Sequence, residues 1–128
     1  MAGILGVAHI GVYVNDIEVS KAFYHDKLGF DIIWQCEVGT DKAAFAQKGD
    51  LTLELIEPAE KKCRPSGVVE HIAMRVKDIE AEAEALKAKG IVFDTDYVDG
   101  SDRVFPNGAR WILFYGPDGE HLELNEVL

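Results

Sequence analysis

The sequence predicts an α+β protein built from two tandem βαβββ modules, with a curved mixed β-sheet lining a cleft and the helices outside it. Two observations predict this class. The stretch Gly6–Val19 recurs 62 residues later, at positions 68–81, and each copy is followed by the same order of helix-like and strand-like segments. The identical pairs are Val7 and Val69, His9 and His71, Ile10 and Ile72, Val14 and Val76, Asp16 and Asp78, Ile17 and Ile79, and Glu18 and Glu80.

The first strand of each module is predicted from aliphatic residues at every second position, the period of a strand with one apolar face. These residues are Ile10, Val12 and Val14 in the first copy and Ile72, Met74 and Val76 in the second. Three further strand-like runs follow the helix of each copy. They cover residues 30–38, 42–49 and 51–57, and residues 91–98, 109–116 and 120–126.

Each helix is predicted by an aspartate near its start and a glycine at its end. The first is expected from Asn15 or Asp16 to just before Gly29, and the second from Asp78 to Gly90. Apolar residues at helical spacing are expected to face the sheet. They are Val19, Ala22 and Phe23 in the first helix and Ile79, Ala83 and Leu86 in the second.

A single domain is expected from these segments, with modules at 1–57 and 68–128 and a connector at 58–67. The connector is interrupted by Pro58, Pro65 and Gly67, which break any periodic pattern. With 128 residues, 48% of them hydrophobic, the chain can bury roughly two thirds of its unfolded surface.

Charge and cysteine usage narrow the classes of partner. The 23 acidic and 13 basic residues give a formal charge of −10, which disfavours nucleic acid and anionic membrane surfaces. No apolar run approaches the ~20 residues of a spanning helix, and no leader pattern precedes the first strand, so a cytoplasmic protein is expected. Cys36 and Cys63 are expected to be free thiols, since nothing suggests a disulfide framework or a zinc cluster.

Strand parity singles out four residues for chemistry. His9 and His71 alternate with the aliphatic residues of the first strands, and Glu54 and Glu123 alternate with the leucines of the last strands. Residues two apart share a face, so all four lie on faces turned away from the helix-packed core. If the two sheets surround a common cleft, the internal repeat brings the four together.

Two imidazoles and two carboxylates suit a divalent transition ion, and they leave positions open for water or substrate. The sequence therefore predicts one such ion per site, with nickel, cobalt, zinc, manganese and iron(II) all open. Either residue type alone is more often a structural histidine or a solvated glutamate. Their repetition at matching places in both modules favours the metal site.

The chain resembles the vicinal oxygen chelate superfamily, in particular glyoxalase I and methylmalonyl-CoA epimerase, over essentially its whole length. The motifs that carry the resemblance are "HIGVYVNDIEVSKAFYHDKLGF", "LELIEP", "EHIAMRVKDIEAEAEALKAKGI" and "GPDGEHLELNE". The resemblance implies a glyoxalase, bleomycin-resistance and dioxygenase-like fold, and usually a homodimer. It also places the family's metal ligands on His9, Glu54, His71 and Glu123.

By this resemblance the protein is a metal-dependent lyase or isomerase that moves a proton through a metal-chelated enediolate. The expected type is glyoxalase I, a lactoylglutathione lyase acting on a methylglyoxal hemithioacetal, with the thiol carrier open. Glu123 is the favoured catalytic base and Glu54 the other candidate. The alternatives are a methylmalonyl-CoA or other epimerase on the same scaffold, including a sugar epimerase, a thiol transferase or ring-cleaving dioxygenase, and a metal-free small-molecule binding or resistance protein.

Four residues are candidates for contacting the substrate. Tyr13 stands where bacterial glyoxalase I enzymes place an arginine, four residues after the first metal histidine, which puts a glutathione pocket in question. Arg75 shares a strand face with His71, and Arg103 and Arg110 flank a turn-rich loop. Each arginine could clamp a substrate carboxylate or phosphate. Trp111 and Phe114 are expected in the core instead.

Overall fold

The computed structural model describes residues 3, 7–60, 71–102 and 104–128. The chain divides into two compact units, Met1–Cys63 and Arg64–Leu128, and each is described by itself. Residues 61–67 of the expected connector, including Cys63, lie outside the described ranges, and Cys36 is a free cysteine. No helix in the described part of the chain has the length and apolar character needed to cross a bilayer.

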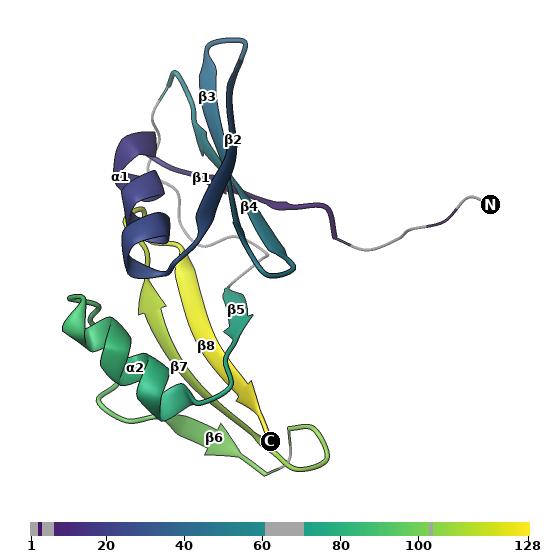
Figure 1. Ribbon diagram of the computed structural model, residues 1–128, viewed down its shortest axis with the longest axis vertical. Helices are drawn as coiled ribbons and strands as arrows, with labels where there is room; N and C mark the ends of the chain where they lie inside the picture. The colour runs from purple at the N-terminus through teal and green to yellow at the C-terminus, as the bar shows by residue number, and fades with distance from the viewer. Residues whose placement is uncertain (1–2, 4–6, 61–70, 103) are drawn as a thin grey trace. The chain divides into compact units, whose positions relative to one another are not determined.

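The first unit is one βαβββ module. Its elements are β1 (Ile10–Tyr13), α1 (Ile17–Ala22), the π-helix η1 (Phe23–Lys27), β2 (Asp31–Val38), β3 (Asp41–Lys48) and β4 (Leu51–Glu57). The strands form a sheet in the order β1-β4-β3-β2, in which β1 is parallel to β4 and the other pairs are antiparallel. The helix α1 covers one face of this sheet (Figure 1).

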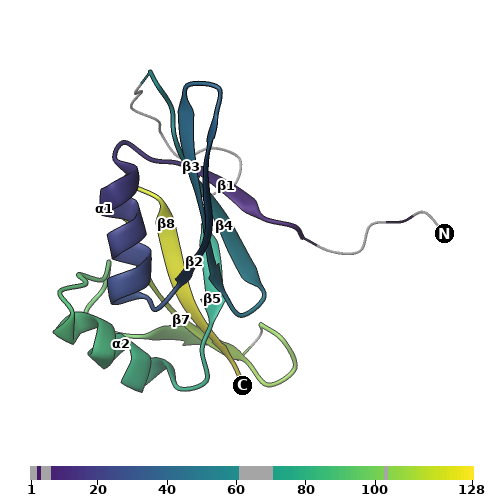
Figure 2. The same ribbon diagram turned by 45° about the horizontal axis from the view of Figure 1, so that its top comes forward.

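The second unit repeats this arrangement. Its elements are β5 (Ile72–Arg75), α2 (Ile79–Ala88), β6 (Asp99–Ser101), β7 (Ala109–Tyr115) and β8 (His121–Val127). The strand order is β5-β8-β7-β6, again with the first strand parallel to the last, and α2 packs against β7 and β8 (Figure 2). The predicted α+β class with two βαβββ modules is confirmed.

The core of each unit lies between the sheet and its helix. In the first unit the buried side chains include Val12, Tyr24, Phe30, Ala44, Leu53 and Leu55. In the second they include Ile79, Leu86, Ile112, Phe114, Leu122 and Leu124. Because strand neighbours point to opposite faces, burial of the leucines of β4 and β8 turns Glu54 and Glu123 away from the helices. The parity on which the site prediction rests is therefore present in both units.

The buried face of α1 differs from the expected one. Ile17, Ser20 and Tyr24 face the sheet, whereas Val19 is 52% exposed. The reason lies at the helix start, where the backbone of Ile17 is held by a carboxylate of β4 and its side chain is turned inward. The wider turns of η1 follow and bring Tyr24 onto the same face. In α2 the expected residues Ile79, Ala83 and Leu86 are all buried.

The strand expected at residues 91–98 is replaced by a bridge and a later, shorter strand. Phe93 makes an isolated bridge to Phe114, and β6 begins only at Asp99. Polar side chains account for the interruption, because the Asp94 carboxylate lies 2.9 Å from His121 Nε2 and Thr95 Oγ1 donates to the Tyr97 carbonyl at 2.7 Å. Trp111 also differs from expectation, since it is half-buried whereas Phe114 is fully buried.

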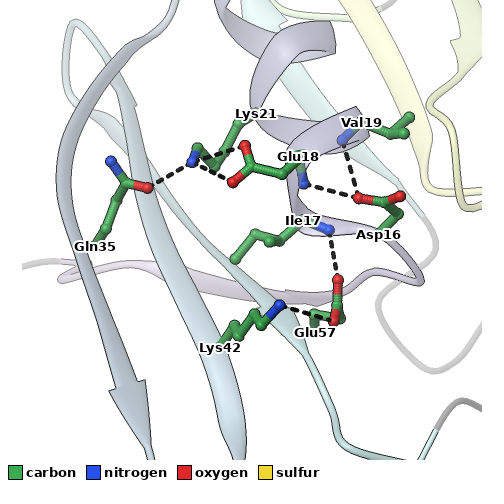
Figure 3. Close-up of polar contacts among 8 residues, drawn as sticks. All are labelled: Asp16, Ile17, Glu18, Val19, Lys21, Gln35, Lys42 and Glu57. Atoms are coloured by element: carbon green, nitrogen blue, oxygen red, sulfur yellow. Dashed lines mark hydrogen bonds and ion pairs between the residues drawn. The ribbon is translucent and has the colours of Figure 1, made fainter.

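A second glutamate in each last strand binds the start of the helix. Glu57 Oε1 accepts a hydrogen bond from the Ile17 amide at 2.8 Å, and Glu126 Oε1 accepts one from the Ile79 amide at 2.8 Å. Asp16 adds a conventional N-cap, accepting from the Glu18 amide at 3.0 Å (Figure 3). These two helix-start glutamates, Glu57 and Glu126, tie the last strand of each module to the helix that follows its first strand.

Replacing Glu57 by alanine is expected to lower the free energy of unfolding by about 1–3 kcal/mol, because the Ile17 amide loses its charged partner in a part-buried position. Chemical denaturation checks this. The matched control is Glu18→Ala, which removes an exposed carboxylate paired with Lys21 and should change stability by less than about 1 kcal/mol. Equal effects of the two substitutions would contradict the role given to Glu57.

Candidate metal centre

The first unit brings one imidazole and one carboxylate together on the face opposite α1. His9 precedes β1 and Glu54 lies in β4, and their Nε2 and Oε1 atoms are 3.5 Å apart. The His9 ring also packs edge-on against Phe45, with centroids 5.4 Å apart. Gly11 and Phe45 are the partners of Glu54 in register on the two neighbouring strands.

The second unit repeats the pair. His71 precedes β5, Glu123 lies in β8, and their Nε2 and Oε1 atoms are 3.9 Å apart. Exposure follows the repeat as well, because the side chains of His9 and His71 are 42% and 41% exposed whereas those of Glu54 and Glu123 are 21% and 12% exposed. Each module therefore presents an accessible imidazole next to a mostly buried carboxylate.

These separations suit two ligands of one cation. At 3.9 Å the His71 and Glu123 atoms are too far apart for a hydrogen bond. Metal bonds of about 2.1 Å place neighbouring donor atoms roughly 3.0–3.5 Å apart. The pair in the first unit matches that spacing, and the pair in the second exceeds it by a few tenths of an ångström. Imidazole nitrogen and carboxylate oxygen are also the donor types that divalent transition ions accept.

Each unit supplies two of the four predicted ligands. Among the residues that the structure describes, no group of three or more histidine, cysteine, aspartate and glutamate side chains gathers at one point. A four-ligand centre therefore needs the pair from each module. The assignment of all four residues to one ion stays a prediction.

The Glu123 carboxylate has a further partner in its own strand. Asn125 Nδ2 donates to Glu123 Oε2 at 2.9 Å, while the other oxygen of Glu123 faces His71. Glu123 is only 9% exposed as a residue, so this carboxylate is buried and oriented from two sides. The Asn125 amide therefore fixes which oxygen of Glu123 faces His71.

The predicted substrate contacts fall in different places. Tyr13 is 49% exposed on the Glu54 face of β1, and Arg75 is exposed at the matching position of β5, in register with Asn125. Arg110 points to the helix side of the second sheet, where it pairs with Glu80 of α2. Arg103 lies outside the described ranges. Tyr13 and Arg75 thus share a sheet face with a ligand pair, and Arg110 does not.

Sequence reasoning overlooked the helix-start glutamates and Asn125. The signal was present in the two pentapeptides "LELIE" and "LELNE", which end β4 and span most of β8. Their first glutamates were recognised by parity. The second glutamates, Glu57 and Glu126, repeat with the same spacing and point to the opposite face.

Comparison with known proteins identifies one protein family over most of the chain. The model of the Glyoxalase/Bleomycin resistance protein/Dioxygenase superfamily matches residues 6–124. The protein YaeR of Escherichia coli (strain K12) is 35% identical over 135 residues, covering 98% of this chain and 99% of YaeR.

Solved structures share the fold. A glyoxalase family protein from Enterococcus faecalis superposes with a TM-score of 0.79 and 26% identity, covering 95% of this chain and 98% of the other. The fosfomycin resistance protein FosX from Listeria monocytogenes, whose structure contains Mn(II) and sulfate, gives a TM-score of 0.71 and 22% identity over 98% of this chain and 95% of FosX. The chain therefore belongs to the Glyoxalase/Bleomycin resistance protein/Dioxygenase superfamily.

Proposed function

We propose that this protein is a metal-dependent lyase or isomerase that moves a proton on a carbon next to a carbonyl, in the manner of glyoxalase I. The observation that carries the proposal is the matched pair of imidazole and carboxylate in each module, with donor atoms 3.5 and 3.9 Å apart. His9, Glu54, His71 and Glu123 would hold one divalent ion. Nickel, cobalt, zinc, manganese and iron(II) fit this donor set, and the Mn(II) in the FosX structure supports a cation of this kind.

The ion would supply Lewis acidity, which stabilises the negative charge that develops on a substrate oxygen when the neighbouring carbon loses its proton. The residues of the chain supply the rest. His9 and His71 would hold the ion through their imidazole nitrogens, and Glu54 and Glu123 would hold it through carboxylate oxygens. A glutamate carboxylate accepts the proton from the substrate carbon and returns it to the adjacent carbon, which requires it to come within hydrogen-bond reach of that proton.

The proposed substrate is a small 2-oxoaldehyde joined to a thiol as a hemithioacetal. Tyr13 and Arg75 are accessible on the sheet faces that carry the ligand pairs, and Arg75 suits a carboxylate or phosphate on the thiol carrier. Arg103 is kept as a candidate contact from the sequence alone. Arg110 already pairs with Glu80, which favours a structural role. A homodimer and a cytoplasmic location remain predictions.

The proposal is tested with metal-loaded protein and hemithioacetals of methylglyoxal made with several thiols. Wild type is expected to convert at least one of them to a hydroxyacyl thioester and to exchange the substrate proton with solvent deuterium. The double variant Glu54→Gln/Glu123→Gln should lose both activities by at least about 100-fold, because it removes both candidate bases. Exchange that is unchanged in the double variant would contradict the proposal.

A metal-free binding or resistance protein is the competing function, and FosX shows that the fold serves antibiotic resistance in another organism. Elemental analysis of the purified protein, followed by calorimetric titration with Mn²⁺ and Co²⁺, separates the two. The enzyme predicts stoichiometric binding of one ion. A protein that binds neither ion would exclude the enzyme in favour of simple ligand binding.

A further inference from the structure

The last strand of each module, β4 or β8, contains nearly the same pentapeptide. The two pentapeptides differ at a single position. Residues 53–57 read "LELIE" and residues 122–126 read "LELNE". The leucines are buried in both modules, and the second glutamate of each pentapeptide accepts a hydrogen bond from a helix start. The fourth position is Ile56 in β4 and Asn125 in β8. The internal repeat thus makes Ile56 a natural reference for the role of Asn125.

Asn125 is placed to hold the neighbouring glutamate. It shares the sheet face of Glu123, and its Nδ2 atom donates to Glu123 Oε2 at 2.9 Å. Arg75 of β5 and Trp111 of β7 are its partners in register on either side, so the half-buried amide has neighbours on both adjacent strands. The hydrogen bond leaves Glu123 Oε1 facing His71 Nε2.

The first module cannot make the equivalent hydrogen bond. Ile56 has no donor on its side chain, so Glu54 has an apolar neighbour where Glu123 has an amide. Glu54 is also the more exposed of the two carboxylates, 21% against 12% for the side chain. The two modules repeat the ligand types but restrain the two carboxylates differently.

From this difference we infer that Asn125 is a positioning residue that fixes the Glu123 carboxylate as the stationary ligand and leaves Glu54 as the carboxylate able to turn toward a substrate. The inference rests on the proposed function for the metal role of Glu123 and Glu54. It reverses the preference for Glu123 as the base, because a base must rotate to reach the substrate proton. A residue that hydrogen-bonds to a metal ligand fixes the orientation of that ligand and thereby changes the affinity of the site for the metal.

The first test uses the metal-free protein and needs no activity. In NMR spectra, the side-chain amide signals of Asn125 should shift when Glu123 is replaced by glutamine and should be unaffected by Glu54→Gln. This outcome is expected because the amide proton points at the Glu123 oxygen. Asn125 side-chain amide signals that do not shift in the Glu123→Gln protein would overturn the inference.

The second test measures metal affinity by competition with a chromophoric chelator, using Co²⁺ as the probe. Asn125→Ile, which makes the second module a copy of the first, should raise the dissociation constant by about 10- to 100-fold, as loss of an orienting partner does in other metal sites. The matched control is Gln47→Ile, which removes an exposed amide that donates to Thr52 in the first unit. It should change the dissociation constant by less than about 2-fold.

The third test separates the two glutamates. At saturating metal, Glu54→Gln should reduce solvent deuterium exchange into the substrate more than Glu123→Gln, whereas Glu123→Gln should weaken Co²⁺ binding more than Glu54→Gln. The opposite order in both measurements, or an Asn125→Ile protein that binds Co²⁺ like the control, would overturn the inference. If wild type binds metal but turns over no hemithioacetal, the proposed reaction fails, while the NMR and affinity measurements still decide the role of Asn125.

Discussion

Alanine at either His9 or His71 is expected to weaken binding of a divalent ion by more than about 100-fold. The estimate exceeds the 10- to 100-fold loss typical of an orienting partner, because a ligand itself is removed. The two histidines lie at matching places in the repeat, with side chains exposed to almost the same extent, 42% and 41%. If one ion binds to both histidines, either single substitution should cause nearly the full loss of metal affinity. The variant with both histidines replaced should then bind metal only slightly more weakly than either single variant.

The measurement is a Co²⁺ titration of the two single variants and the double variant. His25→Ala is the matched control, because His25 is also accessible, at 61% for the side chain, and is also paired with a carboxylate, that of Asp26. It should bind like wild type. Two single variants that each lose half of the bound metal, with unchanged affinity in the remainder, would show two independent sites and contradict a shared ion.

Alanine at Phe114 is expected to lower the free energy of unfolding by about 3–5 kcal/mol, a large share of the roughly 5–15 kcal/mol that stabilises a domain. Phe114 is fully buried in β7, its ring packs edge-on against Phe93 at 5.4 Å, and it pairs with Leu122 of β8. Its removal leaves a cavity beneath the strand that carries Glu123. Urea denaturation followed by circular dichroism provides the measurement.

The control for Phe114 is Val92→Ala, since Val92 is 85% exposed and its truncation should change stability by less than about 0.5 kcal/mol. Metal affinity adds a second comparison. Phe114→Ala should keep measurable Co²⁺ binding under conditions where it remains folded, because Phe114 faces away from Glu123. A Phe114 variant as stable as the Val92 control would contradict the packing described for the second unit.

The fold could be predicted largely because the repeat combines two signals that agree. Alternating aliphatic residues in β1 and β5 give the strand faces, and an aspartate at the start of each helix gives its position. Ile79, Ala83 and Leu86 were correctly expected in the core because α2 follows a regular helical period. In α1 the bond from the Ile17 amide to Glu57 turns Ile17 inward and η1 widens the later turns, so the apolar spacing of Val19, Ala22 and Phe23 was misleading.

The sequence predicts which residues form the candidate site and on which sheet face they lie, but it does not predict most of their side-chain contacts. Parity placed His9 and Glu54 on one face, but the alternation carries no information on the Asn125 hydrogen bond or on the partner of Arg110. Those depend on side-chain rotamers and on which strands become neighbours. The two pentapeptides repeat Glu57 and Glu126, but the helix-start amides that these glutamates bind lie 40 and 47 positions away, and no local pattern identifies those partners.

A shared ion is tested most directly by anomalous diffraction from crystals grown with Mn²⁺ or Co²⁺. One strong peak is expected, about 2.0–2.3 Å from His9 Nε2, His71 Nε2 and a carboxylate oxygen each of Glu54 and Glu123, whether the two modules come from one chain or from two copies. Peaks bound by one module alone, or a structure in which either His–Glu pair has no ion beside it, would contradict a shared ion.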